Sequence, residues 1–277
     1  MIKQILHASR PLSWVNTAFP FAAAYLLSGG GVNWLLILGT FFFLIPYNIA
    51  MYGINDVFDY ESDIRNPRKG GVEGAVLPRH MHTPLLWASA ITTLPLLLIM
   101  ATQGAVAWLL FSAFCVVAYS APPLRFKERP VLDSATSSAH FVTPAIIGAA
   151  YGQPPQGFWL AMASFFLWGM ASHALGAVQD VQSDRAGGLH SIATKLGPGL
   201  TVRLVVGAYA LSALLLFFLP SPAWLIGLAG FGYALNAARF MGVTVQTSPS
   251  VNRAWRVFLV LNFVVGAILT MVLLALT

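Results

Sequence analysis

The stretch PLSWVNTAFPFAAAYLLSGGGVNWLLILGTFFFLIPYNIAMYGIN, residues 11–55, contains no Asp, Glu, Lys or Arg. A helix that crosses a bilayer needs about 20 apolar residues. These 45 residues are therefore long enough for two crossings. Three consecutive glycines at positions 29–31 lie near the middle, where they are typical of a turn. The stretch predicts two membrane helices joined by a tight turn.

The same arrangement repeats along the chain. Four further stretches lack all four charged residue types, namely 80–124, 134–179, 204–238 and 257–277. By length, the first three have room for two crossings each and the last for one. We therefore predict an all-α, polytopic membrane protein with nine transmembrane helices in a bundle. The expected helices are 11–28, 34–57, 84–102, 104–121, 133–151, 157–179, 199–219, 223–243 and 253–276.

The composition excludes several other classes of protein. Hydrophobic residues make up 57% of the chain and charged residues 9%, whereas a soluble domain carries about 25% charged residues. A soluble fold and intrinsic disorder are therefore both excluded. Cys115 is the single cysteine, which rules out an intramolecular disulfide framework and a metal site made of thiolates alone. The net charge of +6 indicates loops held beside an anionic membrane rather than a nucleic-acid partner.

The charged residues all fall on one side of the predicted bundle. The positive-inside rule places that side and the N-terminus in the cytoplasm, with the C-terminus outside a cell membrane. Lys3 and Arg10, ahead of an apolar stretch, would also suit a signal peptide. Because no clear small-residue cleavage motif follows, we expect the first helix to be retained.

An acidic motif follows the second predicted helix, where the sequence reads GINDVFDYESD from position 53. Its candidate metal ligands are Asn55, Asp56, Asp59 and Asp63. Three of them recur every four residues and share one face of a helix. Asp56, three residues before Asp59, joins that face, whereas Glu61 points elsewhere. We expect Asp59 and Asp63 to be catalytic.

A second acidic motif contains Asp180 and Asp184, again four residues apart, after the sixth predicted helix. We expect both to be metal ligands and catalytic residues. The segment GINDV at 53–57 aligns with GAVQDV at 176–181, both at a helix exit and 124 residues apart. This predicts a single domain over 1–277 with an internal pseudo-repeat. The first four helices occupy about 1–130 and the next four about 131–250. The ninth helix follows the second repeat.

Carboxylates at the end of a membrane bundle require compensation. Hard oxygen ligands suit Mg²⁺, which takes one or two carboxylates and completes its shell with water and substrate phosphates. Two facing motifs could hold Mg²⁺ ions around a diphosphate. The alternative is a solvated loop whose acids pair with Arg65, Arg68 and Lys69. Two motifs with matched spacing favour the metal.

Basic and polar residues complete the candidate site. Arginine makes bidentate phosphate contacts and lysine supplies a point charge. His173 lies seven residues before Asp180, on the same helical face. A proton relay is one role that this position suggests for it, and an interhelical hydrogen bond is the alternative. The candidate substrate-binding residues are Asn16, Asn55, Arg68, Lys69, Tyr119, Arg125, Lys127, His173, Arg185 and Lys195.

Over nearly its whole length the sequence resembles the UbiA superfamily of intramembrane prenyltransferases. The motif N-D-x-x-D-x-x-x-D is matched from Asn55 to Asp63, and D-x-x-x-D-x-x-x-G from Asp180 to Gly188. The element Y-S-x-P-P-L-R-x-K runs from Tyr119 to Lys127. The resemblance implies nine helices around a central, lipid-open cavity, with Mg²⁺ and an allylic diphosphate between the two motifs. The diphosphate departs, and the allylic cation alkylates a lipophilic acceptor.

Two segments point to one branch of that superfamily. Residues 66–77 read NPRKGGVEGAVL and residues 122–134 read PPLRFKERPVLDS, which is similar to the lycopene elongases. That resemblance implies dimethylallyl diphosphate as donor and lycopene as acceptor, in carotenoid biosynthesis. An aromatic acceptor, as in quinone or chlorophyll-type lipid synthesis, is the first alternative. A transporter using paired acids is the second, although transporter acids cluster near the bilayer midplane.

Overall fold

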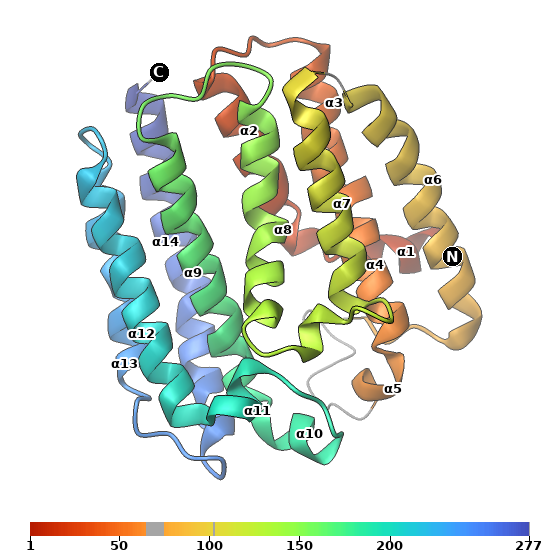
Figure 1. Ribbon diagram of the computed structural model, residues 1–277, viewed down its shortest axis with the longest axis vertical. Coiled ribbons are helices and arrows are strands. Elements are labelled where there is room, and N and C mark those ends of the chain that lie inside the picture. Colours follow the sequence, from red (N-terminus) through yellow and green to blue (C-terminus); the bar gives the residue numbers. More distant parts are fainter. Residues whose placement is uncertain (65–74, 102, 277) are drawn as a thin grey trace. The chain divides into compact units, whose positions relative to one another are not determined.

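The computed structural model describes residues 1–64, 75–101 and 103–276, and within them every regular element is a helix (Figure 1). The chain divides into two compact units. The first comprises residues 1–126 and 139–155, and the second comprises residues 127–138 and 156–277. The all-α prediction is therefore confirmed for the described residues.

The described residues of the first unit form seven α-helices and the later part of an eighth. They are α1 (Ile2–Ala8), α2 (Val15–Leu27), α3 (Trp34–Leu44), α4 (Pro46–Phe58), α5 (Tyr60–Asp63), α6 (His82–Met100), α7 (Val106–Ser120) and α8 (Leu132–Ala149). Helix α4 packs against α6 and α7, α2 packs against α3, and α1 packs against α4. Aromatic residues dominate the core, with Phe21, Phe43 and Tyr47 almost fully buried.

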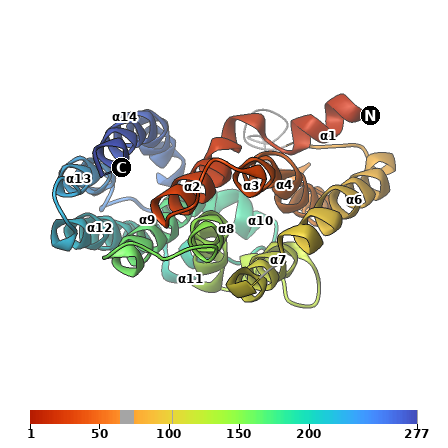
Figure 2. The ribbon, with the colours of Figure 1, turned by 90° about the horizontal axis from the view of Figure 1, so that it is seen from above.

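The second unit contains the start of α8 and six further helices. They are α9 (Phe158–Gln179), α10 (Val181–Ala186), α11 (Ile192–Leu196), α12 (Pro198–Leu215), α13 (Trp224–Ala238) and α14 (Asn252–Leu276). Helix α12 packs between α9 and α13, and α14 lies beside α13 (Figure 2). The core includes Val178, Val202 and Tyr209, each buried to at least 99%.

The predicted helix over 34–57 is broken where proline enters it. Proline has no N–H to donate and its ring clashes with the preceding helical turn, so α3 ends at Leu44 and α4 begins at Pro46. The side-chain amide of Asn48 donates to the carbonyl oxygens of Phe43 (2.8 Å) and Leu44 (3.1 Å). These bonds satisfy backbone groups that the break releases.

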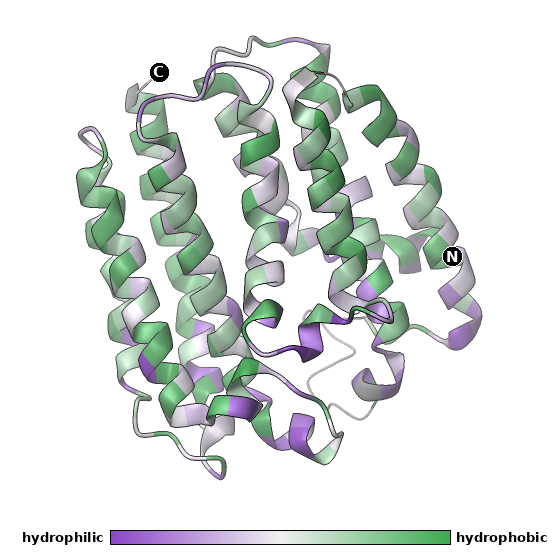
Figure 3. Ribbon diagram, viewed as in Figure 1, coloured by the Kyte–Doolittle hydropathy of each residue, from purple (hydrophilic) through white to green (hydrophobic). Residues whose placement is uncertain are grey.

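Among the described residues, five helical segments are long and apolar enough to cross a membrane. They are Trp34–Phe58, Arg79–Met100, Phe158–Gln179, Pro198–Phe218 and Ser248–Ala275. Two shorter apolar helices are Val106–Ser120 and Trp224–Ala238. The helices are hydrophobic along most of their length, and the hydrophilic residues of the first unit gather around α5, those of the second around α10 and α11 (Figure 3). The count of nine crossings stays a prediction.

Candidate active site

The first acidic motif lies where α4 ends and the short helix α5 begins. Asp59 is the residue that follows α4, with φ −100° and ψ −2°. Asp63 ends α5, and its backbone N–H donates to the carbonyl oxygen of Asp59 at 2.9 Å. Both residues are 7% exposed. Two carboxylates are thus held in buried positions at a helix break.

Asn55 connects this motif to α7. Its Nδ2 donates to Asp59 Oδ2 at 2.8 Å and to Ser120 Oγ at 2.9 Å. Helical spacing brings Asn55 and Asp59 together, as the sequence predicts. Ser120, the last residue of α7, is a partner that sequence analysis missed, because the two residues are 65 positions apart.

Asp56 has a different neighbour from the other acids of the motif. Its Oδ1 accepts a hydrogen bond from Arg10 Nη2 at 2.9 Å, and the carboxylate side chain is 2% exposed. The guanidinium of Arg10 also lies over the ring of Tyr52, 4.2 Å from the ring centre. From the sequence, Arg10 suggests only the basic end of a signal peptide. The structure assigns it to the motif instead.

Glu61 behaves as predicted. Its carboxylate pairs with Arg79 at the surface, where the two side chains are 63% and 72% exposed. It therefore lies apart from the buried acids of the motif. Arg68 and Lys69, two predicted phosphate ligands, lie outside the described residues.

The second acidic motif repeats the local geometry of the first. Asp180 follows α9 with φ −94° and ψ −3°, and Asp184 lies in α10. The N–H of Asp184 donates to the carbonyl oxygen of Asp180 at 2.8 Å. Gly188, the last residue of the motif, has φ +69°, a conformation that favours glycine.

This geometry corrects the alignment of the two motifs. The sequence alignment paired Asp56 with Asp180. The helix ends instead pair Asp59 with Asp180, and Asp63 with Asp184, at a constant separation of 121 residues. An alignment by residue type pairs the wrong aspartates, because the first motif has one acid more than the second. Only the position of the helix end fixes which aspartates correspond.

The predicted basic residues have different environments. Burial lowers the pKa of Lys127 to about 8, while the negative charges of Glu128 and Asp184 act in the opposite direction. Lys127 thus lies within electrostatic range of the second motif. Arg185 is exposed, and its Nη2 donates to the carbonyl oxygen of Thr194 at 3.3 Å. Lys195 is exposed near the end of α11.

The remaining candidates are placed as follows. Arg125, after the two prolines, is half-buried and has a positive φ of 39°. Tyr119 is half-buried, and its ring meets that of His140 edge-on with 5.3 Å between centres. Asn16 is exposed on α2. His173, in α9, is hydrogen-bonded to Ser134 of α8.

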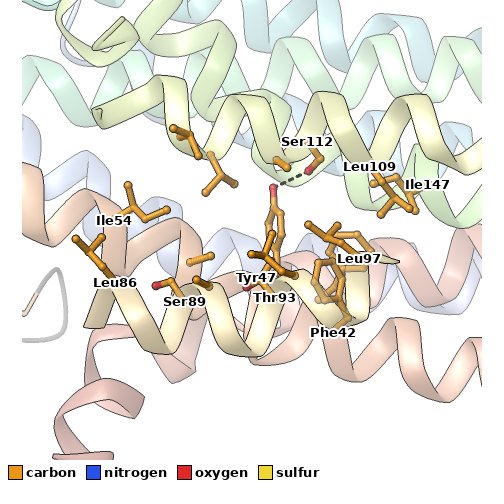
Figure 4. A pocket seen from close by; sticks show the side chains of 17 residues that line it. Phe42, Tyr47, Ile54, Leu86, Ser89, Thr93, Leu97, Leu109, Ser112 and Ile147 are labelled. Carbon is orange, nitrogen blue, oxygen red and sulfur yellow. Dashed lines mark hydrogen bonds between the residues drawn. The ribbon is translucent and has the colours of Figure 1, made fainter. Parts of the chain in front are cut away.

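The first unit also contains an apolar pocket of about 220 Å³ (Figure 4). Its walls come from α3, α4, α6 and α7, with Ile147 of α8 at one end. The hydroxyl of Tyr47 and Ser112 Oγ, 3.0 Å apart, are hydrogen-bonded to each other in the wall. No aspartate lines this pocket. Ile54, the residue before Asn55 of the first motif, lies in its wall.

The acidic residues suit a Mg²⁺ ion that takes only one or two protein carboxylates. Within the described part of the chain, no three His, Cys, Asp or Glu side chains gather into one metal-binding group. The two buried carboxylates of the first motif match an ion that takes one or two carboxylates and is completed by phosphate and water. Asn55, which holds Asp59 in place, is the kind of outer partner that orients a ligand.

The sequence matches the family model described as UbiA prenyltransferase family over residues 17–265. The chain belongs to this family. A lycopene elongase/hydratase of Corynebacterium glutamicum is 58% identical to it, over 99% of this chain and 97% of that protein. A C(50) beta-cyclic carotenoids biosynthesis protein of Dietzia is 50% identical, over 99% of this chain and 65% of that protein.

A solved UbiA homologue from Archaeoglobus fulgidus, bound to DMAPP and Mg²⁺, has a similar fold. The TM-score is 0.70 at 19% identity, over 95% of this chain and 98% of that one. The UbiA-like fold predicted from the two aspartate motifs is therefore confirmed. The chain is a membrane-embedded prenyltransferase.

Proposed function

We propose that this prenyltransferase adds the five-carbon group of dimethylallyl diphosphate to lycopene in a Mg²⁺-dependent reaction. The observation that carries the proposal is the matched pair of motifs, each with one aspartate at a helix end and another four residues on. The 58% identical lycopene elongase/hydratase supports the choice of acceptor.

The residues of the chain fit separate tasks in this reaction. Asp59 and Asp63 in the first motif, and Asp180 and Asp184 in the second, would hold the metal ions. Asp56 stays in the proposed ligand set with one oxygen paired to Arg10. Asn55, predicted from the sequence as a metal ligand, is proposed to act through Asp59, to which its amide donates. Bound Mg²⁺ neutralises the charge of a departing diphosphate.

The chemistry requires charge stabilisation and exclusion of water. The C–O bond to the diphosphate breaks and gives an allylic cation, and the terminal double bond of the acceptor attacks that cation. Lys127, beside the second motif, would stabilise the negative leaving group. The same task is proposed for the side chains of Arg68, Lys69, Arg125, Arg185 and Lys195. Apolar surroundings protect the cation from water.

The cellular setting is part of the proposal. The positive-inside rule places the charged loops, and hence both motifs, at the cytoplasmic face of a cell membrane. The N-terminus would lie inside and the C-terminus outside. A reporter fused to each terminus would test this orientation.

Expression in a lycopene-producing cell tests the acceptor. We expect pigments heavier than lycopene by one or two five-carbon units, and no such pigments from a chain carrying Asp59→Asn. Membranes supplied with dimethylallyl diphosphate and a hydroxybenzoate provide the comparison. If only the aromatic compound is prenylated, the acceptor is an aromatic ring and not lycopene. Solute uptake without diphosphate release would indicate a transporter.

A further inference from the structure

A buried acid, a hydroxyl and an imidazole form a continuous hydrogen-bonded chain in the second unit. Asp133 and Ser134, near the start of α8, are 0% and 1% exposed. Ser134 Oγ donates to Asp133 Oδ1 at 3.2 Å and lies 3.1 Å from His173 Nδ1 in α9.

The carboxylate at the far end of this chain is strongly held. Asp133 Oδ1 also accepts from the backbone N–H of Ser134 at 2.7 Å, and Oδ2 accepts from the N–H of Ile192 at 2.7 Å. All three groups donate to Asp133, which is the pattern around an ionised carboxylate, since that group can only accept hydrogen bonds. The bond to Ile192 also ties the segment after the second motif to α8.

The hydrogen bonds set the tautomer of His173. Ser134 has one hydroxyl proton, and a charged carboxylate is a stronger acceptor than a neutral imidazole. The proton therefore points to Asp133, so His173 Nδ1 carries a hydrogen and donates to Ser134 Oγ. In that tautomer the lone pair is on Nε2. A negative charge behind the hydroxyl stabilises the imidazolium that forms when Nε2 takes a proton.

The position of His173 suits the end of the proposed reaction. His173 lies seven residues before Asp180, which is two helical turns, about 10 Å along α9 on the same face. One prenyl unit and its leaving group can fill that length. Of the six histidines, His140 and His173 lie inside long helices. The ring of His140 packs against Tyr119, whereas His173 has the carboxylate chain behind it.

We propose that His173 is the base that takes the proton lost after alkylation, with Ser134 and Asp133 as its positioning residues. The proposal rests on the proposed function. Attack by the acceptor double bond forms a C–C bond and leaves a tertiary cation. A neighbouring C–H bond then breaks, its electron pair becomes the new double bond, and the proton goes to Nε2. No oxidant or reductant is required.

The first test compares two side chains that both link α8 to α9. The wild type, His173→Gln and Ser138→Ala are purified at full length and assayed in lycopene-containing liposomes with dimethylallyl diphosphate and Mg²⁺. Ser138 lies one turn beyond Ser134 and donates to the carbonyl oxygen of Phe166 at 2.7 Å, so it controls for loss of a helix–helix hydrogen bond. We expect kcat to fall about 100-fold in His173→Gln, with KM for dimethylallyl diphosphate within threefold of wild type. Ser138→Ala should keep kcat within threefold.

Two further variants keep the test decisive. Ser134→Ala leaves the imidazole and the Asp133–Ile192 bond in place, and should lower kcat about tenfold with KM unchanged. In folded His173→Ala, added imidazole should raise kcat at least tenfold above the value of the variant without imidazole. A purely structural role of His173 would give no such increase. Wild-type kcat in His173→Gln or Ser134→Ala, or no rescue by imidazole, would overturn the assignment. If wild type itself does not elongate lycopene, the proposed function fails instead.

Discussion

Asp59 and Asp180 occupy the same backbone position at the ends of two different helices. Asp59 follows α4 with φ −100° and ψ −2°, and Asp180 follows α9 with φ −94° and ψ −3°. In each case a short helix begins immediately and carries a second aspartate four residues on. The two motifs are therefore equivalent in local structure, which supports equivalent roles.

This equivalence predicts equal effects of substitution. Asp59→Asn and Asp180→Asn keep the size of each side chain and remove its charge, so each should lower kcat at least 1,000-fold by weakening metal-assisted departure of the diphosphate. The measurement is diphosphate release by purified protein in liposomes. Glu61→Gln is the control, because Glu61 pairs with Arg79 at the surface. It should stay within twofold of wild type, and an active Asp180→Asn would refute an equivalent role for the second motif.

The two Arg–acid pairs of the first unit should differ in their effect on stability. Asp56 is 2% exposed in its pair with Arg10, so Arg10→Gln should lower the free energy of unfolding by about 3 kcal/mol. Arg79→Gln removes the partner of exposed Glu61 and should cost less than about 1 kcal/mol. Chemical denaturation in detergent measures both values. Similar losses in the two variants would contradict a supporting role for Arg10.

Asn55 should control the affinity for Mg²⁺ through Asp59. Its amide bonds both Asp59 Oδ2 and Ser120 Oγ, and loss of such an outer partner weakens metal binding about 10- to 100-fold. Asn55→Ala should therefore raise the Mg²⁺ concentration that gives half-maximal activity at least tenfold. Ser120→Ala removes one bond only and should have a smaller effect. A Mg²⁺ titration that is unchanged in Asn55→Ala would contradict this role.

Two glycines offer a matched test of helix packing. A Cβ atom at Gly148 would lie 2.4 Å from the carbonyl oxygen of Phe21, whereas nothing lies within 4 Å of one at Gly207. Gly148→Ala should therefore lower the free energy of unfolding by about 1–3 kcal/mol. Gly207→Ala, within α12, should raise it by up to about 1 kcal/mol. Thermal or chemical unfolding of both variants measures whether the free energy of unfolding falls or rises. An unchanged free energy in Gly148→Ala would contradict the close approach of α2 and α8.

The sequence predicts the helices better than the contacts between them. Charge-free stretches and their central turn residues locate the long helices, since both follow from the cost of charge in a bilayer. The break before Pro46 is a local effect that the hydropathy pattern conceals, because apolar residues continue through it. The lengths of the five apolar segments support a membrane bundle.

Within the candidate site, neighbours on one helix could be predicted and distant partners could not. The Asn55–Asp59 contact follows from a spacing of four residues. Arg10 and Asp56 are 46 positions apart, and Ser134 and His173 are 39 apart. No periodicity links such pairs, since the packing of separate helices brings them together. The alignment of Asp180 with Asp56 instead of Asp59 has another cause, because only the helix end fixes the register of the two motifs.

The most direct test of the central claim is a product balance. Purified protein in lycopene-containing liposomes receives dimethylallyl diphosphate with Mg²⁺, or with a chelator, and mass spectrometry follows lycopene while released diphosphate is counted. We predict one five-carbon unit gained per diphosphate, and neither product in the presence of chelator. Diphosphate release without any gain in the mass of lycopene, or equal turnover without divalent metal, would contradict the account.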